Sequence, residues 1–156
     1  MIRRAAIDDI PAITDLLTQV LGIHHEGRPD LFKAQGTKYS RAELAEIICD
    51  GSTPVFVYTD ASGKVLGHCF CRFEETGESG ARYACRTLYI DDLCVDAQAR
   101  RRHVGSALYE YVKEFARERG VHNITLHAWA LNPGAVEFYR RLGLQVQSYT
   151  LEEVLD

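Results

Sequence analysis

The sequence predicts an α/β fold in which a mixed, mostly antiparallel sheet of six to seven strands carries helices on both faces. Two segments place apolar residues at helical spacing, and two shorter segments begin with helix-start patterns. Strand-like runs bounded by polar turns lie between them. The predicted order is β-α-α-β-β-β-α-β-α-β. Of the 156 residues 46% are hydrophobic and 26% charged, so we expect one globular domain over 1–156.

The first quarter of the chain predicts one strand and two helices. A short strand over Ile2–Ala6 precedes a helix capped by Asp8 or Asp9, with Pro11 in its first turn. Its buried face is expected to comprise Ile10, Ile13, Leu16, Leu17 and Val20. The stretch Gly22–Tyr39 has no clean period and is predicted to be a loop with one helical turn. Ser40 with Glu43 three residues later forms a capping box, which predicts a second helix over Ser40–Asp50.

The middle of the chain predicts three strands. Pro54–Thr59 and Val65–Phe73 are expected to form a hairpin around the turn at 60–64. A polar loop follows at Glu74–Gly80. A long strand is then expected within Arg82–Val95, ending in the residues LYIDDLCV.

The last third predicts two helices and two strands. Within Arg102–Arg119, one helical face carries the apolar residues Val104, Leu108, Tyr111, Val112 and Phe115. A strand is expected over Asn123–Ala130. Pro133 then predicts the start of a short helix over Asn132–Arg141. A final strand is expected over Gln145–Glu152.

Composition argues against several functional classes. The net charge of -4 disfavours a nucleic-acid-binding surface, which needs clustered Lys and Arg. The five cysteines are odd in number and contain no C-x-x-C pair, so we expect reduced thiols and a cytoplasmic location. No stretch approaches the roughly 20 apolar residues of a membrane span, and we expect no membrane association. The histidines have no metal-ligand spacing, so no metal site is expected.

The segment Val95–Leu108 is the most informative for ligand binding. It runs from a strand end through a basic turn into an amphipathic helix, and the free N–H groups of a helix start attract phosphate. Glycine in the first turn lets a diphosphate approach the backbone. From the residues alone, the turn is equally compatible with a solvated basic helix cap. The candidate phosphate-binding residues are Arg100, Arg101, Arg102, His103, Val104, Gly105 and Ser106.

These motifs resemble those of the GNAT N-acetyltransferases, in particular the members that act on diamines and polyamines. Their acetyl-CoA signature Q/R-x-x-G-x-G/A corresponds here to Arg100-x-x-His103-x-Gly105, with His103 replacing the first glycine. LYIDDLCV resembles the family's central strand, and Gly67 matches a glycine of the preceding strand. A second signature, N-x-x-A-x-x-F-Y-x-x-x-G, is formed by Asn132, Ala135, Phe138, Tyr139 and Gly143.

The resemblance implies a direct, acetyl-CoA-dependent transfer of an acetyl group to a primary amine. It places the pantetheine arm along the backbone of Leu93, Cys94 and Val95, with Asn132 and Ala135 also at the cofactor. It also implies that Tyr139 is the general acid, because a phenol with a pKa near 10 holds a proton at neutral pH. Backbone N–H groups of the central strand would stabilise the oxyanion.

The acceptor side is expected around the two acids of LYIDD. By the same resemblance Asp91 orients the substrate ammonium. Since neighbours on a strand point to opposite faces, we expect only one of Asp91 and Asp92 to face the acceptor. The resemblance also implies that the two central strands part at this end of the sheet and that the thioester lies in the gap between them. His25 or Glu26, in the predicted loop, and His127 on the strand beside this gap are further candidates.

Several alternatives remain at this point. The acceptor is predicted to be a small cationic amine, but a protein N-terminus or a lysine is also compatible. A protein of another class, an acyl-CoA-binding regulatory module without turnover, would share the fold. Cys94 as a nucleophile would need a base, and no such arrangement is recognisable. An exposed final strand could pair across a homodimer.

Overall fold

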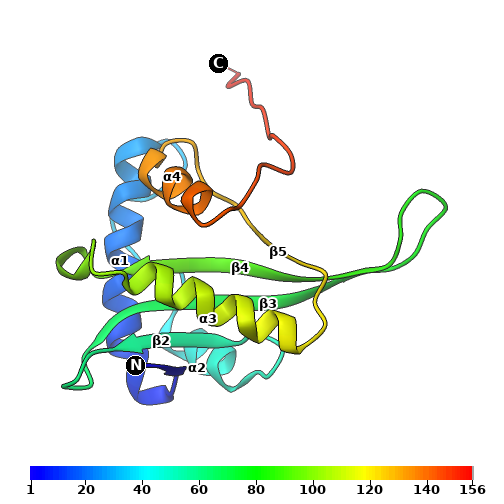
Figure 1. Cartoon of the computed structure of the whole chain (residues 1–156). Helices are drawn as coiled ribbons and strands as arrows, with labels where there is room; N and C mark the ends of the chain where they lie inside the picture. The colour runs from blue at the N-terminus through cyan, green and yellow to red at the C-terminus, as the bar shows by residue number, and fades with distance from the viewer. Residues whose placement is uncertain (156) are drawn as a thin grey trace.

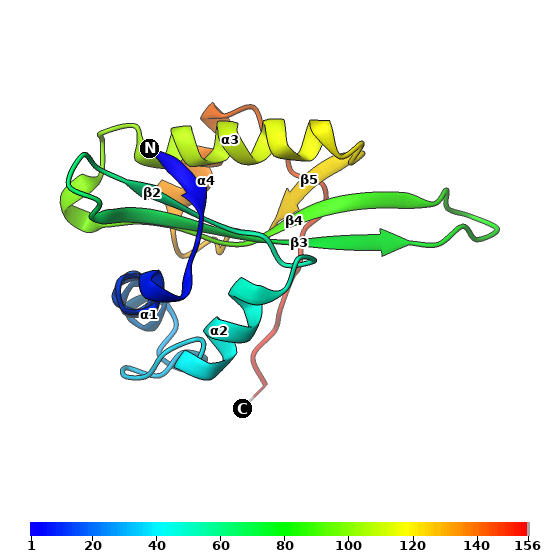
Figure 2. The same ribbon diagram turned by 90° about the horizontal axis from the view of Figure 1, so that it is seen from below.

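The computed structural model describes residues 1–155, which form a five-stranded sheet with helices on both faces (Figures 1 and 2). The strands follow the order β1-β2-β3-β4-β5, antiparallel except for the parallel pair β4–β5. The elements are β1 (Ile2–Arg4), the 3₁₀ turn η1 (Ile7–Asp9), α1 (Ile10–Gly27), α2 (Arg41–Cys49), β2 (Val55–Thr59), β3 (Val65–Thr76), β4 (Cys85–Val95), the 3₁₀ turn η2 (Ala97–Ala99), α3 (Val104–Glu118), β5 (Asn123–Leu126) and α4 (Pro133–Arg141).

Each face of the sheet has its own apolar core. Helices α1 and α2 cover one face, and α3 covers the other (Figure 2). On the α1 side four of the five residues predicted for the buried face of the first helix are buried, Ile10, Ile13, Leu16 and Leu17, and the fifth, Val20, is partly buried against them. On the α3 side Val104, Leu108 and Val112 repeat at helical spacing and are buried. The predicted α/β fold is therefore confirmed.

Gly67 lets α3 approach the sheet closely. A β-carbon at this position would lie 2.7 Å from the carbonyl oxygen of Cys94 and 3.1 Å from the side chain of Val104. Any larger residue would therefore push the start of α3 away from β3 and β4. The glycine fixes the position of the helix start, which the phosphate-binding prediction depends on.

The predicted starts of α2 and α4 are confirmed, whereas Asp9 lies at the N-cap of α1 without a side-chain capping hydrogen bond. The Ser40 hydroxyl accepts from the Glu43 N–H at 3.3 Å, and the Glu43 carboxylate accepts from the Ser40 N–H at 2.6 Å. This reciprocal pair forms the capping box at α2. The Asn132 side-chain oxygen accepts from the Ala135 N–H at 3.1 Å and caps α4, with Pro133 in its first turn.

The strand count of six to seven is wrong, since the described residues form five strands. The predicted last strand, Gln145–Glu152, is an exposed segment without strand structure that follows α4 and extends away from the rest of the molecule (Figure 1). Its alternating pattern cannot make a strand without a partner to accept its backbone hydrogen bonds. The strand expected over Asn123–Ala130 ends at Leu126.

Other element boundaries also differ from the predictions. Helix α1 continues to Gly27, through the first part of the predicted loop, and its end packs against Leu131. Strands β3 and β4 stay paired out to Thr76 and Cys85, which gives a long hairpin arm projecting beyond the sheet (Figure 1). Within residues 1–155, no helix has an apolar run long enough to cross a lipid bilayer.

Candidate active site

Strand β4 contains a bulge at the two adjacent acids. Phe70 on β3 lies opposite Asp92, whereas the next residue, Cys71, lies opposite Ile90, so Asp91 is the extra residue on β4. A bulge breaks the alternation of side chains. Both carboxylates consequently approach the same lysine, Lys38, whose Nζ is 2.7 Å from Asp91 and 3.9 Å from Asp92. The side-chain alternation on which the prediction for the two acids rested therefore does not hold here, and which acid faces the acceptor stays a prediction.

Asp91 is the centre of a charged cluster on the α1 side of the sheet. Its carboxylate accepts hydrogen bonds from Lys38 Nζ and from the Tyr39 hydroxyl, each at 2.7 Å, and from Arg72 at 3.4 Å. Burial alone would raise the pKa of Asp91. The hydrogen bonds from Lys38 and Tyr39 and the charges of Lys38 and Arg72 outweigh it and hold that pKa below its usual range.

A cluster of aromatic rings contributed by three segments of the chain lies beside these acids. The His24 ring on α1 is 4.9 Å from Phe32 and 6.4 Å from Trp129, and Phe32 meets Trp129 edge-on at 5.3 Å. Burial lowers the pKa of His24, although the charge of Asp92 partly opposes this effect. A histidine in these surroundings is neutral at neutral pH and can accept a proton.

The predicted acceptor residues on α1 and after β5 have different surroundings. His25 Nδ1 bonds to the backbone oxygen of Phe32 at 2.7 Å, which holds the loop under α1. Glu26 is exposed on α1. His127 Nδ1 lies 2.9 Å from the Tyr89 hydroxyl, and the Arg72 guanidinium stacks on the Tyr89 ring. His127 is therefore linked through Tyr89 and Arg72 to Asp91.

Strands β4 and β5 part at the bulge. Their last pair is Ile90 with Leu126, whereas β4 continues to Val95 with β3 as its only strand partner among the described residues. The edge of β4 from 91 to 95, which includes Leu93, Cys94 and Val95, therefore has no second strand beside it among the described residues, and an unpaired strand edge is what an extended ligand can add to. The gap predicted from the sequence is thus present.

The Cys94 thiol faces α1 and is unsuited to nucleophilic chemistry. Its Sγ donates to the backbone oxygen of Leu16 at 3.3 Å, and the side chain is buried. Burial raises the pKa of Cys94 to about 12, with Asp92 adding to the rise. The thiol therefore stays protonated, whereas a cysteine nucleophile must be a thiolate.

The turn before α3 has the backbone of an anion-binding helix start. His103 at the N-cap has φ 61° and ψ 12°, and Arg101 also has a positive φ, 62°. His103 thus adopts the left-handed conformation that the family's glycine would favour. Its side chain makes no capping hydrogen bond, so the N–H groups of the first turn, at Val104, Gly105 and Ser106, are left for an external acceptor.

The three arginines around this turn are available to an anion. Arg100, Arg101 and Arg102 are exposed, and none forms an ion pair within residues 1–155. Together with the free first-turn N–H groups, they fit the diphosphate of a coenzyme A. The Asn132 side-chain oxygen is instead committed to the Ala135 N–H within α4.

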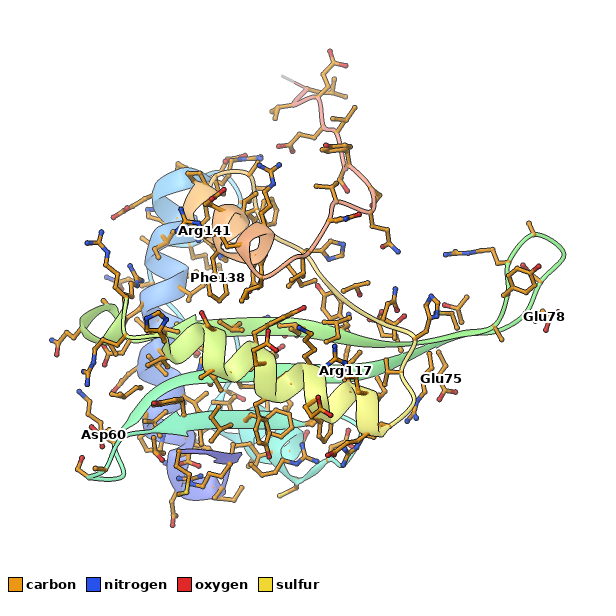
Figure 3. The ribbon with its side chains drawn as sticks, viewed as in Figure 1. Asp60, Glu75, Glu78, Arg117, Phe138 and Arg141 are labelled. Carbon is orange, nitrogen blue, oxygen red and sulfur yellow. The ribbon has the colours of Figure 1, made fainter. Side chains whose placement is uncertain are left out.

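Helix α4 brings Tyr139 to the same region. A β-carbon on Gly105 would lie 3.1 Å from Cζ of Phe138, so the ring of Phe138 rests on the first turn of α3 (Figure 3). The Tyr139 ring is 5.1 Å from that of Phe138. Burial raises the pKa of the Tyr139 phenol above its ordinary value, and the neighbouring Cys69 and Asp92 add to the rise.

Sequence reasoning missed four residues of the cluster: His24, Lys38, Tyr39 and Arg72. One signal could have found two of them. The capping box fixes the start of α2 at Ser40, so Lys38 and Tyr39 close the preceding loop beside the sheet. No local sequence pattern distinguishes His24 from His25. Their side chains point toward different neighbours only because helix α1 continues to Gly27.

The site contains no recognisable metal centre within residues 1–155. No group of three or more His, Cys, Asp or Glu side chains there is placed to hold an ion. The acidic cluster is instead occupied by Lys38 and Arg72.

Two curated proteins resemble parts of the chain. The probable N-acetyltransferase san of Drosophila melanogaster is 32% identical over 83 residues, covering 53% of this chain and 42% of that protein. The uncharacterized N-acetyltransferase MJ1207 of Methanocaldococcus jannaschii is 31% identical over 90 residues, covering 58% and 38%. The chain spans less than half the length of these relatives.

Solved structures resemble the whole chain. The tetramutant of the BH1408 protein from Bacillus halodurans has a TM-score of 0.96 at 26% identity, covering 99% of both chains. The aminoglycoside acetyltransferase meta-AAC0020 from a soil metagenomic sample, in complex with sisomicin, shares the fold, with a TM-score of 0.71 at 20% identity. It covers 100% of this chain and 96% of its own.

One family model covers most of the chain. The model of the acetyltransferase (GNAT) family matches residues 20–144, which include β4, the turn before α3 and α4. The predicted resemblance is therefore confirmed at the level of the family, whereas the diamine and polyamine subgroup stays a prediction. The chain belongs to the GNAT acetyltransferase family.

Proposed function

We propose that the chain is an acetyl-CoA-dependent N-acetyltransferase that acetylates a small cationic primary amine. One observation carries the choice of acceptor: the primary ammonium of Lys38 lies on Asp91, 2.7 Å from its carboxylate and 3.3 Å from its backbone oxygen. The site therefore already holds a group of the acceptor's chemistry. A substrate ammonium would replace Lys38 and use the same two oxygens.

The cofactor is proposed to bind across the open edge of β4. The first-turn N–H groups of α3 and the guanidinium groups of Arg100, Arg101 and Arg102 would hold its diphosphate. The backbone of Leu93 to Val95 would hold its pantetheine arm. Acetyl-CoA supplies an acetyl group activated as a thioester.

Three groups of the chain would manage the protons and the developing charge. An alkylammonium, with a pKa near 10.4, must lose a proton before it can attack. Neutral His24, beside Asp92, is the candidate base. Tyr139 keeps its proton at neutral pH and can donate it to the leaving sulfur. The Leu93 or Cys94 N–H on the open edge of β4 is the candidate donor to the carbonyl oxygen.

Asp91→Asn tests the acceptor site. The KM for a diamine should rise about tenfold to a hundredfold, because a charge-assisted hydrogen bond to the substrate is lost. The Kd for acetyl-CoA, measured by calorimetry, should stay unchanged. Asp15→Asn, at an exposed acid on α1, is the matched control. A weaker acetyl-CoA affinity with an unchanged amine KM would contradict the assignment.

We further propose that residues 1–156 act as one domain in the cytoplasm and associate as a homodimer. The support for association is the C-terminal segment, whose apolar side chains are exposed: Val146 by 52%, Tyr149 by 80%, Leu151 by 90% and Val154 by 70%. Exposed apolar side chains gathered on one segment are typical of an interaction surface.

A further inference from the structure

Lys38 is held at the point where β4 and β5 separate. It lies in the loop between α1 and α2, and its Nζ donates to the carboxylate and to the backbone oxygen of Asp91. The last β4–β5 pair, Ile90 with Leu126, immediately precedes Asp91. The amine of Lys38 is therefore held where the two strands separate, and its charge acts on His24, the proposed base.

None of the other three lysines has such a position. Lys33 is exposed in the same loop and has no ion pair within residues 1–155, so it serves as an internal reference. Lys64 pairs with Asp96 at 3.7 Å in the β2–β3 region, and Lys113 pairs with Glu110 on α3. Lys38 alone contacts both acids of the bulge.

We propose that Lys38 is itself acetylated by this site when no amine substrate is present. The inference rests on the proposed function and identifies a modification site within it. A bond forms between Nζ and the acetyl carbon as the carbon–sulfur bond of the thioester breaks. The ammonium loses two protons, of which one ends on the coenzyme A sulfur through Tyr139 and the other passes to solvent.

Acetylation of Lys38 changes the charge at the acceptor site. An N-acetyl-lysine carries no charge, so Asp91 loses its ion pair with Lys38 and keeps Tyr39 and the ion pair with Arg72. The carboxylate then binds a cationic acceptor without competition from the Lys38 ammonium. Self-acetylation therefore converts an occupied acceptor site into an open one.

Incubation with isotope-labelled acetyl-CoA and no amine, followed by peptide mass spectrometry, tests this directly. Lys38 should be labelled about tenfold or more faster than Lys33, because a held amine reacts in an effectively unimolecular step. The rate constant should not depend on protein concentration, and free thiol should appear in equal amount. Labelling of Lys38 no faster than Lys33, or a rate that rises with protein concentration, would overturn the proposal.

Two substitutions separate modification from simple pairing. In Lys38→Gln the KM for a diamine should fall about twofold to fivefold, as expected when a partly exposed ion pair no longer competes. Lys38→Arg keeps the charge but cannot be acetylated in this way, so its amine KM should not fall after preincubation with acetyl-CoA. Lys33→Arg is the control. An unchanged KM in Lys38→Gln would also count against the proposal.

The failure of this inference is distinguishable from the failure of the proposed function. If amines are acetylated while Lys38 stays unlabelled, only the self-acetylation is excluded. If neither amines nor Lys38 are acetylated by a chain that binds acetyl-CoA, the proposed function fails as well.

Discussion

The titratable side chains around the gap between β4 and β5 have different protonation states near neutral pH. Burial raises the pKa of Tyr139, so the phenol is protonated. The partners of Asp91 outweigh its burial and lower its pKa, so this carboxylate is charged. Burial lowers the pKa of His24, so the imidazole is neutral. One site thus holds an acid, an anion and a base, which amine acylation requires.

The pH dependence of activity tests the role of His24. A base acts only when neutral, so kcat/KM should rise with pH through the pKa of His24, with a midpoint below the ordinary histidine value of about 6.5 because burial lowers it. The acceptor amine gives a separate limb at alkaline pH. His24→Gln should remove the acid limb and lower kcat/KM about a hundredfold.

The control is His122→Gln, at an exposed histidine between α3 and β5. Its pH profile should match that of the unchanged chain. An acid limb that persists in His24→Gln would assign the base elsewhere.

The sequence predicts which residue types form the site, but it does not predict the directions in which their side chains point. LYIDD predicts an acidic pair, yet the alternation rule places the two acids on opposite faces. The bulge reverses that result by inserting Asp91 opposite no residue of β3. A bulge depends on the pairing of two strands, so no pattern within β4 alone predicts it.

At the level of elements, the predictions succeed where local signals suffice. The helices α1 and α3 are predicted by their own periodic apolar residues, and α2 and α4 by the residues at their own starts. All four predicted helices are confirmed. The predicted strand at Gln145–Glu152 fails because a strand needs a neighbour, which the described chain does not provide. Strand β5 shortens for the related reason that β4 turns away at its bulge.

The start of α3 is the element whose role is most directly testable. Arg100→Ala combined with Arg102→Ala should weaken acetyl-CoA binding about tenfold, because two exposed charges near the diphosphate are lost. The remaining affinity should depend less on salt. Calorimetry at low and high ionic strength measures both effects.

The matched control is Arg117→Ala, at the opposite end of α3 (Figure 3). It removes an exposed arginine from the end of α3 far from this turn and should leave the Kd unchanged. An unaltered Kd in the double variant would move the phosphate site away from this turn.

At the scale of the whole molecule, the C-terminal segment is set apart from the rest. Residues 145–155 are exposed, and the ion pair of Glu152 with Arg28 ties the segment to the end of α1. Strand β5 also has one side without a strand partner among the described residues. An unpaired edge and an unpaired extended segment with apolar side chains favour pairing between two copies.

Removal of residues 145–156 tests this association. Sedimentation analysis should find a dimer for the unchanged chain and a monomer for the shortened one. Loss of the contacts that the segment makes within its own chain should lower the thermal unfolding midpoint only slightly, because all of its side chains are exposed. A monomeric full-length chain, or a shortened chain that still dimerises, would exclude this interface.

The central claim is that the gap beside Tyr139 and Asp91 transfers an acetyl group to a primary amine. Its most direct test is the rate of free-thiol release from acetyl-CoA across a panel of small amines, for the unchanged chain, Tyr139→Phe and the control Tyr111→Phe. We expect turnover with cationic primary amines, a kcat about a hundredfold lower in Tyr139→Phe at an unchanged acetyl-CoA Kd, and no change in Tyr111→Phe. Tight acetyl-CoA binding without amine-dependent thiol release, or full activity in Tyr139→Phe, would contradict the account.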